Sequence, residues 1–134
     1  MGNDVKNEIA NLRKIPTDEA VDWLLLNYSV ENPDYWKALQ IIPHLSWRRG
    51  DQIRLAKHYL KKIPFANGKV YDIFLSIMSF KVFIKVMEEK LPIKGENIEL
   101  LLYYLIPALE RYAKTDDEYE LLHSFVLKIR EGDI

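Results

Sequence analysis

The sequence of 134 residues contains no cysteine, only five glycines and six prolines, and no long uninterrupted apolar run. Without cysteine the chain has no disulfide, no thiolate metal ligand and no cysteine nucleophile, and a reducing compartment fits this composition. The low glycine and proline content excludes collagen-like and low-complexity chains. A bilayer-spanning helix needs about 20 consecutive apolar residues, and polar side chains such as Asp72 and Lys81 interrupt the richest stretch, residues 70–86.

The composition fits a single folded domain over residues 1–134. Hydrophobic residues make up 49% of the chain, which excludes intrinsic disorder, and this length is enough to bury a substantial core. The first residues are polar and lack the apolar centre of a signal peptide. We therefore expect a soluble cytoplasmic protein with no membrane association.

Capping residues, prolines and apolar residues at helical spacing predict an all-α fold of about seven helices, with no confident strand. The expected helices cover residues 4–13, a segment starting near Thr17, a segment from Asn32 towards Gly50, a segment capped by Asp51 and closed by Pro64, residues 69–91, residues 96–113, and a last segment starting near Asp116. Residues 69–91 form either one helix or two, with Ser79 as the cap of the second. We expect the last helix to bury Tyr119, Leu122, Phe125, Val126 and Ile129. Short connections predict antiparallel helix hairpins.

Two prolines inside helical patterns suggest a repeated hairpin. Pro43 and Pro107 share an Ile-Pro-x-Leu setting, and each precedes a polar turn and a further amphipathic helix, so that Asp51 aligns with Asp117. Residues 41–63 resemble a HEAT-type repeat, with Pro43, Asp51 and the pair Ile53-Arg54 at the places of that family's proline, aspartate and Val-Arg pair. Residues 105–129 are a degenerate copy. The resemblance implies a short α–α superhelix with a concave binding face, and a compact irregular bundle is the alternative.

Most catalytic signatures are absent from the sequence. It contains no phosphate-binding glycine loop, no Gly-x-Ser-x-Gly elbow and no His-Glu-x-x-His motif. Glu120 and His123 lack the second pair and the two further glutamates that a di-iron bundle requires. We expect no catalytic residue, no metal site and no cofactor. An enzyme whose site is assembled from distant residues, such as His44 with a carboxylate, stays open.

Charge is strongly segregated along a nearly neutral chain. Residues 1–46 hold 4 basic and 7 acidic residues, residues 47–94 hold 11 and 4, and residues 95–134 hold 4 and 9, for net charges of −3, +7 and −5. Arg54, Lys57 and Lys61 fall on one face of a predicted helix. The predicted binding residues are this stripe, two arginines before it and a tryptophan at its rim: Trp47, Arg48, Arg49, Arg54, Lys57 and Lys61.

The basic stripe has three interpretations. In the first, it binds another protein with an acidic surface, in the manner of an adaptor or a toxin-neutralising immunity protein. In the second, it binds nucleic acid by tracking a phosphate backbone, although acidic flanks and a sequence pI near 6.3 weigh against this. In the third, it pairs within the molecule with the acidic C-terminal helices or is merely solvated. Non-enzymatic protein binding is the reading we favour. The sequence gives no oligomeric state and no partner identity.

Overall fold

The described residues of the computed structural model, 2–91 and 95–132, are helical and contain no strand. They form eight α-helices and two 3₁₀ turns: α1 (Asn3–Leu12), α2 (Thr17–Asn27), α3 (Trp36–Ile41), η1 (Ile42–His44), α4 (Arg49–Tyr59), η2 (Leu60–Lys62), α5 (Lys69–Ile77), α6 (Phe80–Lys90), α7 (Gly95–Tyr112) and α8 (Asp116–Glu131). The all-α prediction is confirmed. There are eight helices because residues 69–91 divide in two.

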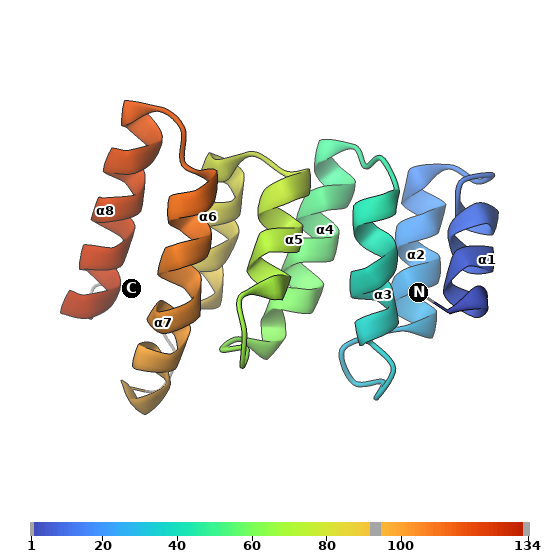
Figure 1. Cartoon of the computed structure of the whole chain (residues 1–134), viewed down its shortest axis with the longest axis horizontal. Coiled ribbons are helices and arrows are strands. Elements are labelled where there is room, and N and C mark those ends of the chain that lie inside the picture. The colour runs from blue at the N-terminus through green and yellow to red at the C-terminus, as the bar shows by residue number, and fades with distance from the viewer. Residues whose placement is uncertain (1, 92–94, 133–134) are drawn as a thin grey trace.

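The helices form four antiparallel hairpins stacked side by side in two layers (Figure 1). Helices α1, α3, α5 and α7 form one layer, and α2, α4, α6 and α8 form the other. Within a layer, helices two places apart in the chain pack together, and α3 is joined to α5 through η1. The turns within the hairpins lie along one edge of the stack, the upper edge in Figure 1, and the connections between hairpins lie along the opposite edge. Helix α4 therefore runs from the turn edge to the connection edge, between α2 and α6.

Local capping explains several helix boundaries. The Ser79 hydroxyl accepts the Val82 N–H at 3.2 Å and starts α6, which decides between the one-helix and two-helix alternatives for residues 69–91. Thr115 caps α8 in a reciprocal capping box with Glu118. Asp51 was expected to cap α4 from outside, but the helix begins at Arg49 and Asp51 lies in its first turn. From there the Asp51 carboxylate accepts the backbone N–H of Arg48 at 3.2 Å.

The two prolines singled out in the sequence have different structural roles. Pro107 lies inside α7, as its helical pattern predicted. Pro43 lies in η1, where the α-helix has tightened into a 3₁₀ turn before an extended Leu45. Proline has no backbone N–H to donate, so an α-helix that continued through Pro43 would lack one hydrogen bond. The change to a 3₁₀ turn ends the helix at this point. The resulting turn brings Leu45 to Arg48 to the edge of the stack.

The core lies between the two layers and is rich in aromatic residues. Tyr59, Tyr71, Phe74, Phe83 and Phe125 are almost wholly buried. In α8, Leu122, Phe125 and Ile129 are buried as expected, but Tyr119 is 42% exposed. The prediction for Tyr119 was wrong because α8 closes the stack and only one of its faces meets other helices. Among the described residues, no helix is both long enough and apolar enough to cross a membrane.

Candidate functional site

The predicted basic residues follow the whole length of α4. Arg48 and Arg49 are exposed at its start on the turn edge, Arg54 lies in its middle, Lys57 lies in its last turn, and Lys61 lies in η2 on the connection edge. At 1.5 Å per residue, Arg48 and Lys61 are about 20 Å apart. The stripe is therefore a ridge along one helix rather than one compact cluster.

The middle of this ridge is paired with neighbouring helices of the same layer. The Arg54 guanidinium lies 2.6 Å from Asp22 of α2, and the Lys57 ammonium lies 3.3 Å from Glu89 of α6. All four side chains are substantially exposed, and such pairs contribute about 0.2–1 kcal/mol each. Pairing within the molecule thus occurs at two positions. Its partners are α2 and α6 rather than the C-terminal helices that the sequence had suggested.

Positive charge accumulates at the connection edge, where α4 and α6 end. We call Lys57, His58, Lys61 and Lys90 the basic edge. Burial lowers the pKa of Lys90, and the neighbouring charges of Lys61 and Lys57 lower it further. Burial also lowers the pKa of His58, followed by the charge of Lys61. Two carboxylates oppose these effects, since Glu89 raises the pKa of Lys90 and Glu31 raises that of His58.

His58 is held in place by a hydrogen bond that requires its neutral form. Its Nε2 accepts the Val30 backbone N–H at 3.1 Å, and the ring stands edge-on to Tyr59. The Tyr59 hydroxyl donates to the Tyr28 carbonyl at 2.7 Å. These contacts tie the end of α4 to the connection that follows α2. The His58 imidazole is half-buried and has a structural role.

Trp47 is a core residue, and its predicted place at the rim of the basic stripe was wrong. Only 9% of its surface is exposed, and its Nε1 donates to the Ile42 carbonyl at 2.9 Å. Gln52 holds the Trp47 carbonyl at 2.9 Å. The indole thus satisfies a carbonyl of the turn around Pro43.

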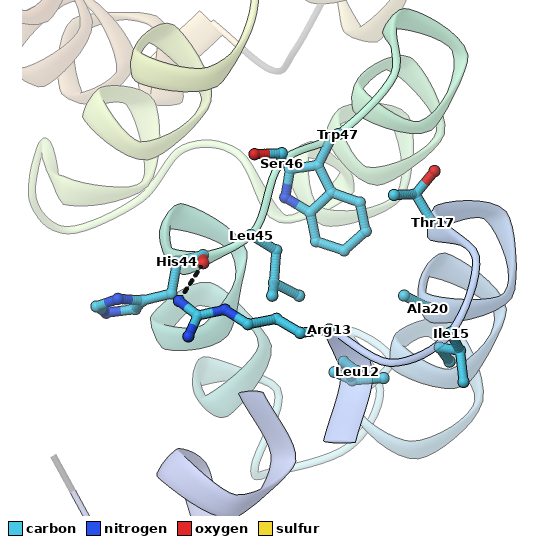
Figure 2. A pocket seen from close by; sticks show the side chains of 9 residues that line it. All are labelled: Leu12, Arg13, Ile15, Thr17, Ala20, His44, Leu45, Ser46 and Trp47. Atoms are coloured by element: carbon cyan, nitrogen blue, oxygen red, sulfur yellow. Dashed lines mark hydrogen bonds between the residues drawn. The ribbon is translucent and has the colours of Figure 1, made fainter. Parts of the chain in front are cut away.

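A cavity of about 430 Å³ lies on the turn edge, between the α1–α2 turn and the turn that leads into α4. Figure 2 shows its lining. Leu12, Leu45 and Trp47 line it with apolar surface, and Arg13 and Ser46 add polar groups. The Arg13 guanidinium donates to the His44 carbonyl at 3.0 Å and so bridges the two turns.

A buried carboxylate fixes the two helices behind this cavity. Asp51 is 6% exposed and is the one buried charged residue among those described. Its Oδ2 accepts the Thr17 hydroxyl at 2.6 Å as well as the Arg48 N–H. Because Thr17 opens α2 and Asp51 lies in the first turn of α4, this interaction fixes the starts of both helices relative to each other.

The described residues do not bring together an arrangement with obvious chemistry. The His44 imidazole is exposed and points away from the other side chains of the cavity (Figure 2). Among the residues that the structure describes, no group of three or more histidines and carboxylates is placed to hold a metal ion. Trp36 and Tyr103 are exposed by 46% and 70%, on the layer opposite to the basic residues.

Sequence reasoning missed Lys90 as part of the basic edge and Arg13 as part of the cavity. Both come from helices distant in sequence from α4. Lys90 could have been found from the hairpin hypothesis itself, because stacked hairpins place each helix beside the one two places along the chain. Arg13 carried no comparable signal, since its contact with the His44 carbonyl spans 31 positions.

Comparisons with known proteins supply no family for this chain. No protein-family model matches it, and no curated protein and no solved structure matches it significantly. A function is therefore argued from the geometry of its surface alone.

Proposed function

We propose that the chain is a non-enzymatic protein-binding module, and that the basic edge and the α4 ridge contact an acidic surface on another protein. The observation that carries the proposal is the convergence of Lys57, Lys61 and Lys90, from the ends of α4, η2 and α6, beside the neutral His58. Lys61 and Lys90 belong to none of the four ion pairs found among the described residues. An acidic partner would relieve the repulsion that these cations exert on one another.

The charges around the ridge favour a protein partner over nucleic acid. Asp18, Glu19 and Asp22 lie on α2 to one side of α4, and Glu88 and Glu89 lie on α6 to the other. A phosphate backbone following the ridge would meet these carboxylates along its path. A protein surface can match alternating charges residue by residue, which also excludes wrong partners.

The proposal extends to the architecture of the module, which is HEAT-like, and to its role as an adaptor or an immunity protein. The HEAT-like resemblance is supported by the two-layer order of the hairpins, in which helices two places apart in the chain pack together, with η1 joining α3 to α5. An adaptor and a toxin-neutralising immunity protein differ in the affinity they need. Binding in the nanomolar range to one partner favours the immunity role, and millimolar binding contradicts it.

The test is a pull-down from lysate of the source cell with three baits. The first is the unchanged protein, and the second carries Lys61→Glu and Lys90→Glu. The third carries Lys6→Glu on α1 and Lys14→Glu in the α1–α2 turn. Lys6 and Lys14 are exposed, so the third bait changes net charge equally without changing the basic edge. We expect one stoichiometric protein band that survives nuclease, weakens with salt and is lost from the second bait alone.

Two results would contradict the proposal. If the band is equally strong with all three baits, the basic edge does not contact the partner. If the eluate contains nucleic acid in place of a protein band, and salt releases it, the ridge contacts phosphates and the alternative of nucleic-acid binding replaces the proposal.

A further inference from the structure

We propose that the cavity between the α1–α2 turn and the turn before α4 is a binding site for a carboxylate on a short apolar body, with Arg13 holding the carboxylate. This inference is independent of the protein-binding proposal. The cavity lies on the turn edge of the stack, and the basic edge lies on the opposite, connection edge (Figure 1).

The size and lining of the cavity fit a small ligand. Its volume of about 430 Å³ falls at the lower end of the range for small-molecule sites, roughly 300–1,000 Å³. The buried Leu12 and Trp47, with the half-buried Leu45, supply apolar surface for the body of the ligand. Arg13 and Ser46 supply a few polar groups on the same cavity, the combination that ligand sites commonly show.

Arg13 is suited to an anion in both charge and orientation. Guanidinium has five N–H donors, and the bond to the His44 carbonyl uses one of them while holding the side chain between the α1–α2 turn and the turn before α4 (Figure 2). Arg13 belongs to none of the four ion pairs found among the described residues. No aspartate or glutamate is among the lining residues, so no carboxylate of the wall competes for it.

The walls of the cavity are fixed before any ligand binds. The Trp47 indole is held by its bond to the Ile42 carbonyl at 2.9 Å. The Asp51 carboxylate joins Thr17, another lining residue, to the start of α4 through a bond of 2.6 Å. A site with fixed walls loses little conformational entropy on binding, which favours recognition of a small molecule.

The test uses 3-phenylpropionate as the probe and the neutral 3-phenylpropionamide as its isosteric control. Binding is followed through the three tryptophan indole N–H signals in a ¹H–¹⁵N spectrum. Trp47 lines the cavity, and Trp23 and Trp36 do not, so they serve as internal controls. We expect the acid to shift the Trp47 signal alone, with an affinity in the millimolar range for a probe of this size, and the amide to bind about tenfold more weakly.

Variants identify the group that recognises the charge. Arg13→Gln is expected to weaken binding of the acid about tenfold and to remove its preference over the amide. Lys14→Gln deletes the neighbouring positive charge outside the cavity and should change neither. Lys61→Glu with Lys90→Glu should also leave the probe's affinity unchanged, which separates this site from the protein-binding surface.

The proposal is overturned if acid and amide bind alike, if Arg13→Gln binds the acid like the unchanged protein, or if the Trp23 and Trp36 signals shift together with that of Trp47. A further arm identifies the source of the carboxylate. A short peptide ending in a free phenylalanine carboxylate that binds more tightly than the acid supports the chain terminus of another protein. Tighter binding of the acid supports a free small molecule.

Discussion

Replacing Asp51 with alanine is expected to destabilise the protein by about 2–3 kcal/mol. The change removes two hydrogen bonds to a buried carboxylate, from the Thr17 hydroxyl at 2.6 Å and from the Arg48 N–H at 3.2 Å. Hydrogen bonds to charged groups contribute about 1.5–3 kcal/mol each, and a helix-start acceptor about 0.5–2 kcal/mol. Thr17 is half-buried, so its hydroxyl can bind water in the variant, and the expected loss is smaller than the sum of the separate hydrogen-bond contributions.

The expected loss can be measured by thermal and urea unfolding. At about 2.1 cal/mol/K per residue, the unfolding entropy of 134 residues is about 0.28 kcal/mol/K, so the melting temperature should fall by about 7–11 °C. Thr17→Val completes a double-mutant cycle, in which we expect a coupling of about 1 kcal/mol with Asp51→Ala.

Asp117→Ala is the matched control, because Asp117 is exposed in the first turn of α8 and holds only a favourable place near the helix N-terminus. It should cost less than about 1 kcal/mol. Equal losses for Asp51→Ala and Asp117→Ala, or a cycle without coupling, would refute the view that Asp51 joins α2 to α4.

Three further predictions concern single side chains. The pKa of His58 is lowered from its usual 6.5, so the unfolded chain binds more protons than the folded protein near that pH. The free energy of unfolding should therefore fall as the pH drops from 7 to 5. In His58→Gln, the free energy of unfolding measured with urea should depend less on pH over this range. Tyr59→Phe removes the donor to the Tyr28 carbonyl and should cost about 1–2 kcal/mol, measured by urea unfolding, with no loss of helical circular dichroism. Ser79→Ala removes the cap of α6 and should cost about 1 kcal/mol; a change near zero in a thermal melt would show that the cap is dispensable.

Much of the fold could be predicted because helix starts and stops are encoded locally. Ser79, the acidic residues after Thr115 and the apolar period of α7 each act within a few positions, and the structure places them as expected. The start of α4 was misplaced because Asp51 suits both a cap and a first turn. Its contact with Thr17, 34 positions earlier, depends on how α2 and α4 pack.

The surface was harder to predict because it depends on which helices are neighbours. The sequence showed that Arg54 and Lys57 share a face, but their partners Asp22 and Glu89 come from α2 and α6. In the sequence, nothing distinguishes Trp47 from a tryptophan that is exposed at an interface. In the structure its indole is buried and donates to the Ile42 carbonyl, a contact that depends on the path of the turn around Pro43.

The stacking order of the hairpins also has a consequence for local opening. Each helix packs mainly against neighbours along the stack, so α4 and α5 are covered on both sides, and α1 and α8 at the two ends are covered on one. Opening an end helix exposes less apolar surface than opening a middle one, and local opening free energies follow that difference. Amide hydrogens should therefore exchange slowest in α4 and α5 and progressively faster towards both ends. The end hairpins should thus open before the middle of the protein does.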